Sequence, residues 1–308
     1  MEKILLILVA ILSLPVTAKE LITVYTPYSA SHAGIVANHR VIDVVNNMQN
    51  KYQFILELKP GAQGAIALRT MDEDPQYRLS IINAAFVDNI DNGLIKEENY
   101  VPVHSAGDAC WAIVSTKGNE RQGLTSLKGT GEIVVGSVGF GNATHLTALQ
   151  IGERFNLPVR FIPYKSNSDA TIAMAGGHGV NFGLERVRVI RQLKEKNPNL
   201  NILAMSCPKR HPDAPEIKTL MEYNIVAPYV FNTVVANKSM PKAKQQELGE
   251  LLDKATLIVG QKEIQRLSDM RPAIFDQVTA EDFHTRRLIT VRTLRNKHKH
   301  TIEKDRSQ

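Results

Sequence analysis

The chain has 308 residues, of which 43% are hydrophobic and 22% are charged. This is an ordinary globular composition, so a largely disordered chain is excluded, and the length suggests about two domains. The 19 Gly and 14 Pro follow no period, which excludes collagen-like and low-complexity chains. The formal net charge of +6 permits binding of anions or nucleic acid without demonstrating either.

The first 18 residues have the features of a secretory signal. An apolar run over residues 4–14 follows Lys3, and it is too short for a membrane-spanning helix of about 20 residues. The small residues Val16 and Ala18 stand where a signal peptidase reads the chain, so we expect cleavage after Ala18 and export. An uncleaved anchor is the alternative.

The two cysteines are Cys110 and Cys207. An exported protein meets an oxidising compartment, in which they could pair. Neither has a CxxC partner, which disfavours zinc binding and thioredoxin-type chemistry. The sequence leaves three states open: a disulfide, two buried thiols, or a reactive cysteine.

Strands and helices alternate along the first hundred residues. Most of the strands are apolar runs, which is typical of a parallel sheet covered by helices on both faces. The expected elements, in chain order, are a strand at 21–25, a loop at 27–33, a helix at 36–48, a strand at 54–58, a turn at 60–64 leading into a helix, and a strand at 78–83.

The alternation starts again after about residue 105. Strands are expected at 110–115, 133–136, 160–162, 202–205 and 230–235, and helices at 143–155, 169–175 and 185–195. A further helix follows, with Ser239 as a possible cap, Pro241 near its first turn, and an apolar face that includes Leu248 and Leu252. A last helix begins at Thr279, with Asp282 in the position of a capping-box acid.

Ligands of such α/β units bind at the carboxyl ends of the strands, where three loops are unusual: 27–32, 60–64 and 136–145. The third, Gly136 to His145, carries several glycines and opens a helix, whose first N–H groups favour an anion. It matches neither the dinucleotide fingerprint nor a phosphate-binding P-loop. An anion cradle and a plain tight turn both remain possible.

The other candidate residues carry weaker signals. Tyr164 and Lys165 lie just past a strand end, and His32 and His145 each lie in a loop. Neither of these histidines has a second His or a carboxylate at metal-ligand spacing, and no GxSxG nucleophile motif occurs, so we expect neither a metal site nor an enzyme. We interpret the basic residues over 292–306 as a solvated helix face with a frayed end.

Three segments in order resemble the substrate-binding proteins of tripartite tricarboxylate transporters, the Bug family: Gly139 to Leu146, Val159 to Lys165, and Ala173 to Val180. Pro60 to Gly64 is similar to the glycine-rich turn of that family. The resemblance covers about residues 21–283. The chain departs from the family pattern in its first loop, where Ser29 to Gly34 replaces glycines and an Asp, and at Ser166 and Asn181.

The resemblance implies a two-lobed Venus-flytrap α/β fold, each lobe a mostly parallel sheet flanked by helices. Lobe 1 would comprise residues 19–104 and 228–308, and lobe 2 residues 105–227. A small carboxylate would be held between the lobes largely by backbone N–H groups and ordered waters. The implied ligand-binding residues are Tyr28, Ser29, Ser31, His32, Gln63, Gly64, Ala65, Gly139, Gly141, Asn142, Ala143, Thr144, His145, Tyr164 and Lys165.

The implied protein is a monomeric periplasmic receptor that needs no cofactor and delivers its ligand to membrane permease subunits. Three alternatives remain. One is a sensor that signals to a membrane kinase through the same pocket. Another is a secreted hydrolase using His145 or His32, and the third is a nucleic-acid binder using the basic end of the chain. The predicted signal and an aromatic content of 6% argue against nucleic acid as a partner.

Overall fold

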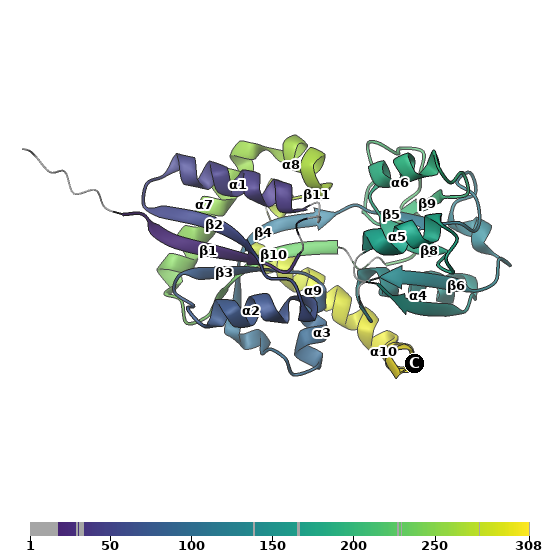
Figure 1. Cartoon of the computed structure of the whole chain (residues 1–308), viewed down its shortest axis with the longest axis horizontal. Coiled ribbons are helices and arrows are strands. Elements are labelled where there is room, and N and C mark those ends of the chain that lie inside the picture. Colours follow the sequence, from purple (N-terminus) through teal and green to yellow (C-terminus); the bar gives the residue numbers. More distant parts are fainter. Residues whose placement is uncertain are drawn as a thin grey trace, which may run out of the picture.

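The computed structural model describes residues 18–28, 30, 34–137, 139–164, 167–226, 228, 230–276 and 278–307. Of the predicted signal, residues 1–18, all but Ala18 therefore lie outside the described residues. Two sheets lie side by side, each with helices on both faces (Figure 1). We refer to the body around the first sheet as lobe 1 and the body around the second as lobe 2.

The sheet of lobe 1 has the strand order β11–β4–β10–β3–β1–β2. β1 pairs in parallel with β2 and β3, whereas β10 runs antiparallel to β3 and β4. The chain returns from lobe 2 into β10. β10 therefore starts at the edge of the sheet where β3 ends, and it runs antiparallel to β3. The strands are β1 (Glu20–Thr26), β2 (Tyr52–Leu58), β3 (Arg78–Ile82), β4 (Tyr100–Ala109), β10 (Val230–Asn237) and β11 (Met270–Arg271).

Helices cover both faces of this sheet. Successive residues of its strands point to opposite faces, and residues on both faces are buried. Ile22 and Val24 of β1 pack with residues of α1 and α7, whereas Tyr25 packs with residues of α2 and α9 on the other face. The helices of this lobe are α1 (Gly34–Met48), α2 (Ala65–Asp72), α3 (Ala85–Asp91), α7 (Lys242–Val259), α8 (Gln261–Ser268) and α9 (Ala280–Lys297), with 3-10 turns η1 (Ala62–Gly64), η2 (Glu97–Asn99) and η5 (Ala273–Asp276).

The sheet of lobe 2 has the order β7–β6–β8–β5–β9 and is also mixed, because β5 runs antiparallel to β8 and β9. α4 packs on one of its faces, and α5 and α6 pack on the other (Figure 1). The elements are β5 (Ala112–Ser115), η3 (Leu124–Leu127), β6 (Ile133–Ser137), α4 (Ala143–Phe155), β7 (Val159–Pro163), α5 (Asn167–Ala175), β8 (Phe182–Glu185), α6 (Val187–Lys194), β9 (Asn201–Met205) and η4 (Met221–Tyr223).

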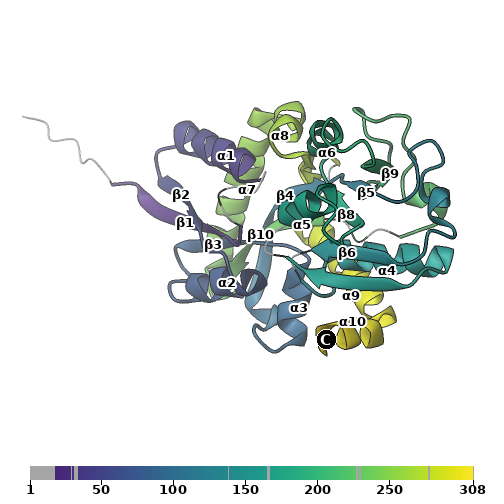
Figure 2. The same ribbon diagram turned by 45° about the vertical axis from the view of Figure 1, so that its right-hand side comes forward.

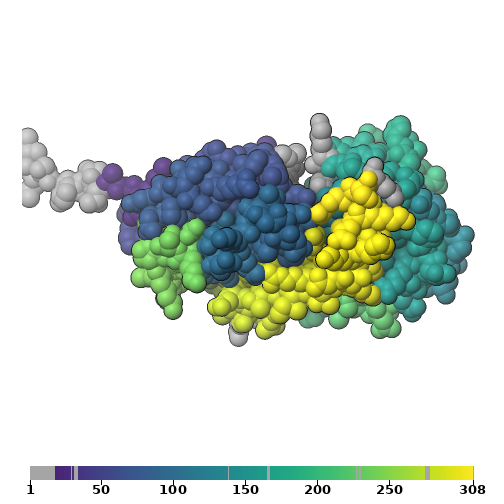
Figure 3. Space-filling model, turned by 90° about the horizontal axis from the view of Figure 1, so that it is seen from below, coloured from purple at the N-terminus to yellow at the C-terminus, as the bar shows by residue number. Residues whose placement is uncertain are grey.

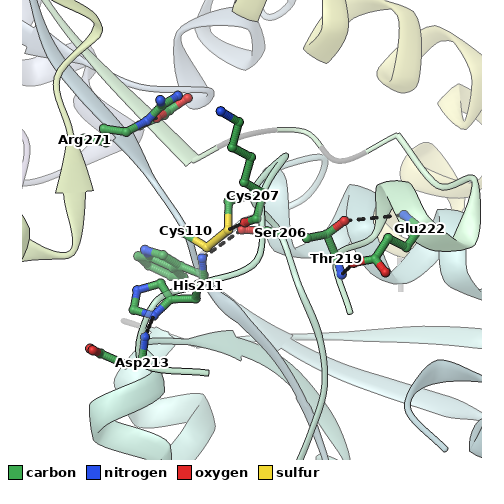
Figure 4. The surroundings of a disulfide bond; sticks show 11 residues. Cys110, Ser206, Cys207, His211, Asp213, Thr219, Glu222 and Arg271 are labelled. Atoms are coloured by element: carbon green, nitrogen blue, oxygen red, sulfur yellow. Dashed lines mark hydrogen bonds and ion pairs between the residues drawn. A yellow bond between two sulfur atoms is a disulfide. The ribbon is translucent and has the colours of Figure 1, made fainter. Parts of the chain in front are cut away.

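A disulfide lies where the chain first crosses between the lobes. Only Cys110 and Trp111 separate β4 from β5, and Cys110 is bonded to Cys207, just past β9. Trp111 and Ser206 continue the pairing of β5 with β9, since the Ser206 amide donates to the Trp111 carbonyl over 2.8 Å. Figure 4 shows the bond beside Ser206, with Arg271 of lobe 1 in the same surroundings. Of the states that the sequence left open, the structure shows the disulfide.

The end of the chain forms an arm, α9 with α10 (Lys299–Ser307), that touches both lobes (Figures 2 and 3). The first part of α9 packs against lobe 1, where Phe283 contacts Phe231 of β10. Further along, Leu294 and Ile302 share an apolar cluster with Leu146 of α4. The expectation of a solvated helix face with a frayed end over 292–306 is therefore wrong, because this stretch buries Leu294, Arg295 and Ile302.

The expected two-lobed α/β fold is confirmed, but its sheets are mixed rather than mostly parallel. The helix expected at 143–155 coincides with α4. The helix expected at 185–195 is wrong at its start, since Glu185 ends β8 and α6 begins at Val187. Ser239 does not cap α7, whose N-cap is Pro241 and carries no side-chain hydrogen bond. Among the described helices, none has the length and apolar character needed to cross a membrane.

Candidate functional site

The carboxyl ends of strands from both lobes meet at the edge between the sheets. In lobe 1, β1 and β3 end there, at Thr26 and Ile82, and β10 begins there at Val230. In lobe 2, β6, β7 and β8 end there, at Ser137, Pro163 and Glu185. Four described segments at this edge form the candidate site: the glycine loop 139–142, the turn 61–64, Tyr28 and Tyr164.

The glycine loop leads from β6 into α4. The Asn142 side chain caps this helix, because its Oδ1 accepts from the His145 amide over 2.9 Å. Its Nδ2 donates to Ser137 Oγ over 2.7 Å, and Ser137 in turn donates to Asn167 at the start of α5. The amides of Ala143 and Thr144 have no partner available within the helix, which makes the start of α4 suitable for an anion.

His145 lies beneath the loop with no exposed surface. Its Nδ1 accepts from the Gly141 amide over 3.0 Å, so its Nε2 carries the proton and donates to Asp305 of α10 over 3.1 Å. Burial, with His298 and Arg295 nearby, lowers the His145 pKa to about 3. The imidazole is therefore neutral at physiological pH, and it links the loop to the C-terminal arm.

Tyr164 follows β7 and packs against Gly136 of β6, the strand that leads into the glycine loop. A Cβ added at Gly136 would lie 3.1 Å from the Tyr164 ring and 2.8 Å from Ala170. Glycine is therefore required at position 136 for the ring to reach this place. The Tyr164 amide donates to the Ser137 carbonyl over 2.8 Å, which fixes the ring at the end of β6.

Tyr28 forms a polar cluster with two asparagines on the lobe 1 side. Its hydroxyl donates to Asn232 Oδ1 on β10 and accepts from Asn83 Nδ2 over 2.9 Å. Burial raises the pKa of Tyr28 to about 12, although both asparagine bonds lower it, so the hydroxyl keeps its proton. The sequence prediction missed Asn83 and Asn232. A polar residue at the end of the predicted strand 78–83 was the available signal for Asn83.

The turn 61–64 approaches the glycine loop from lobe 1. Gly61, Ala62, Gln63 and Gly64 all have positive φ, and 42° at Ala62 and 51° at Gln63 are unusual for residues with a Cβ. The Gln63 side chain reaches lobe 2, since a Cβ added at Gly139 would lie 2.9 Å from Gln63 Oε1. Two of the three predicted loops therefore meet.

Glu185 and Arg186 were not predicted as site residues. Glu185 is buried at the end of β8, where it accepts from the Arg186 amide over 2.8 Å and from Ser168 Oγ over 3.2 Å. Burial raises the Glu185 pKa. The Arg186 guanidinium lies 3.7 Å from Glu185 and 3.9 Å from Asp269 of lobe 1, so it bridges the lobes.

Ser29, Ser31, His32 and Lys165 lie outside the described residues, so the structure says nothing of the first loop beyond Tyr28 and Ala30. Gly64 and Ala65 are buried at the start of α2. Among the residues that the structure describes, no three His, Cys, Asp or Glu side chains group as a metal site would require. The described loops present amides, hydroxyls and backbone dipoles, and such groups can hold a polar or anionic ligand.

Comparison with known proteins identifies the family. A family model described as "Tripartite tricarboxylate transporter family receptor" matches residues 121–302, more than half of the chain. A UPF0065 protein of the gbd 5' region of Cupriavidus necator is 25% identical over 231 residues, which cover 71% of this chain and 69% of that protein.

Solved structures show the same fold. MatC from Rhodopseudomonas palustris, solved with malate, has a TM-score of 0.70 at 14% identity and covers 90% of this chain and 98% of its own. A second R. palustris protein, solved with adipate, gives 0.74 at 15% identity and covers 91% and 96%. A TctC solute-binding protein from Polaromonas gives 0.67 at 20% identity and covers 90% and 98%. This chain belongs to the tripartite tricarboxylate transporter receptor family of solute-binding proteins.

Proposed function

We propose that this receptor binds a small carboxylate, with dicarboxylates as the first candidates, between its two lobes. The observation that carries the proposal is the contact of Gln63 with Gly139, because it brings hydrogen-bonding groups of both lobes to one place. Hydrogen bonds to a carboxylate are about twice as strong as those between neutral groups. The structural neighbours solved with malate and adipate support a dicarboxylate as ligand.

The proposed roles follow from what each side chain already does. The amides of Ala143 and Thr144 would hold one carboxylate at the start of α4. The Tyr28 hydroxyl, Gln63 and Tyr164 would bind the rest of the ligand, beside Gly64, Ala65 and Gly139. Gly141, Asn142 and His145 would act by shaping the loop, because their polar atoms are engaged. Ser29, Ser31, His32 and Lys165 are included on the family resemblance alone.

In this proposal the chain is exported to the periplasm and acts there as a monomer. The open receptor captures the carboxylate, the lobes close on it, and the closed form docks on the permease subunits of a tripartite transporter. The ligand is released unchanged, so the receptor performs no catalysis. Docking on a permease is favoured over signalling to a kinase by the family description, which names a transporter receptor.

A thermal-shift panel on the chain beginning at Lys19 tests the proposal. The protein is first unfolded and refolded to remove co-purified ligand, then mixed with malate, adipate, citrate, aspartate and benzoate, and with neutral amides as controls. A ligand at about 100 times its dissociation constant adds about 2.7 kcal/mol of stability, so the expected result is a raised midpoint with one carboxylate class and none with its amide. Equal shifts with acid and amide, or no shift with any acid, would reject carboxylate binding.

A further inference from the structure

Asp88 and Asn89 are neighbouring residues of α3, and their hydrogen bonds lead to the two loops that meet between the lobes. Both side chains are buried, with exposed fractions of 3% and 1%. We propose that α3 is the support that positions both loops, Asn89 through the turn 61–64 and Asp88 through Arg295 and the glycine loop. The inference rests on the proposed function in taking these loops as the ligand loops.

Asn89 holds the turn of lobe 1. Its Nδ2 donates to the Gln63 carbonyl over 3.1 Å. Ala62 and Gln63 are both left-handed there, a conformation that residues with a Cβ keep only where the surroundings impose it. A fixed carbonyl at Gln63 also fixes the start of its side chain, which is the part of lobe 1 that reaches Gly139.

Asp88 holds the glycine loop of lobe 2 through Arg295 of the C-terminal arm. Arg295 Nη2 donates to Asp88 Oδ1 over 2.8 Å, and its Nε donates to Asp91 over 3.0 Å. Its remaining nitrogen, Nη1, donates to the Gly141 carbonyl over 3.3 Å. A Cβ at Gly141 would collide with that nitrogen, so the guanidinium is packed directly against the loop.

This arrangement fixes the spacing of the loops from one turn of helix. Arg295 is only 8% exposed, and a charged group at that depth must keep its partners. Arg306 of α10 adds a second donor to Asp88 over 2.8 Å, which ties the end of the arm to the same carboxylate. Asp88, Asn89 and Arg295 are therefore positioning residues, which act on a ligand only through the loops.

The test uses Arg295→Lys and Asn89→Ala with two matched controls. Lysine keeps the charge of residue 295 but cannot reach Asp88, Asp91 and Gly141 together. Arg292→Lys is the first control, because Arg292 lies on the same helix and pairs with the surface residue Glu97. Asn237→Ala is the second control, because Asn237 bonds to Asp72 at the far end of β10.

Hydrogen exchange of the ligand-free proteins measures the positioning directly. Loss of the support should speed exchange about tenfold at amides 139–145 in Arg295→Lys and at 61–65 in Asn89→Ala, while strands β1 and β6 stay protected. Neither control should change the exchange rates of these amides. Unchanged loop exchange, or an equal increase throughout the protein, would overturn the inference.

Ligand affinity gives the second measurement. For whichever carboxylate raises the wild-type midpoint, titration calorimetry should show a dissociation constant about tenfold higher in both variants, at unchanged stoichiometry, and unaltered in both controls. Unchanged affinity in the variants would overturn the positioning role. If the wild type binds no carboxylate, the proposed function fails while the exchange experiment still decides whether α3 positions the loops.

Discussion

At the scale of single residues, His145 shows how position changes the chemistry of a side chain. It accepts a backbone proton at Nδ1 and donates from Nε2 to Asp305, so both ring nitrogens are occupied within the protein. A histidine that serves as a general base needs a free nitrogen at the substrate, which this one lacks. The structure thus favours a structural role for His145 over the hydrolytic role considered from the sequence.

The pH dependence of stability tests this neutral state. The His145 pKa is about 3 in the folded protein against an ordinary 6.5, so the unfolded chain takes up the proton first as the pH falls. The stability from His145 is present above pH 6.5 and is lost between 6.5 and about 3, at up to about 1.4 kcal/mol per pH unit. Urea unfolding between about pH 4 and 7 should therefore show a shallower pH slope for His145→Gln than for the wild type.

His178→Gln is the control, because His178 is exposed in the loop after α5 and should keep the wild-type slope. Part of the slope should survive in His145→Gln, since burial also lowers the pKa of His284 to about 4. Identical slopes for the wild type and His145→Gln would contradict the neutral, buried imidazole.

At the scale of secondary structure elements, the C-terminal arm packs on both lobes. α9 begins at a Thr279 cap, whose side chain accepts from the Asp282 amide over 3.1 Å, as the capping-box pattern predicted. Its last turns and α10 then pack on α4 through Leu294 and Ile302. The arm joins the lobes through apolar contacts, whereas Arg186 joins them through an ionic contact.

Ile302 and Ile289 make a matched pair for testing this packing. Ile302 is 4% exposed within the cluster that contains Leu146, whereas Ile289 on α9 is 58% exposed. Ile302→Ala should lower the free energy of unfolding by about 2–5 kcal/mol, because it leaves a cavity in a packed cluster. Ile289→Ala should change it by less than about 0.5 kcal/mol. Equal effects in urea denaturation would show that α10 does not pack on lobe 2 in solution.

At the scale of the whole molecule, the lobes are joined by three kinds of connection. Covalent crossovers run from β4 to β5 and from β9 to β10, the arm α9–α10 packs on both lobes, and polar contacts link Gln63 and Arg186 to the opposite lobe. Trp111, the single tryptophan of the sequence, contacts apolar clusters of both lobes at the first crossover. The Cys110–Cys207 bond limits bending at this crossover, because it ties Cys110, the first residue of the crossover, to lobe 2.

Removing the disulfide should reduce global stability. The bond joins cysteines that are 97 positions apart in the sequence, and cross-linking a loop of that length restricts the unfolded chain strongly. The double variant Cys110→Ser/Cys207→Ser should lose about 2–4 kcal/mol in urea unfolding. A thiol reductant should lower the wild-type midpoint and leave the double variant unchanged, and a wild type that is insensitive to reductant would contradict the bond.

The sequence allowed prediction of the elements with strong local patterns. α4, with three glycines before it and Asn142 as cap, was placed to the residue. β4 was missed because it contains Pro102, Gly107 and Asp108, and its pairing with β10 and β11 is what stabilises it. β10 shifts register beside Pro102, and Gly107 packs against the Arg271 carbonyl, so those residues fit only in the tertiary setting.

The candidate site was likewise predictable only where its residues carry a strong local pattern. The glycine loop and the turn 60–64 carry backbone requirements that show in the sequence as Gly and Pro. Asn232 and Arg295 carry no local signal, because their roles depend on partners, Tyr28 and Asp88, about two hundred residues away in the chain.

The sequence by itself determined the α/β class and the loops at the strand ends, since periodicity and glycine placement act over a few residues. Its motifs also identified the family, by resemblance. Only the tertiary structure decided the mixed sheets, the pairing of the cysteines and the burial of the basic C-terminal segment. It also decided which polar atoms of Gly141, Asn142 and His145 are hydrogen-bonded within the protein. These features depend on the side chains that meet when distant segments pack, and burial then sets their charge and hydrogen bonding.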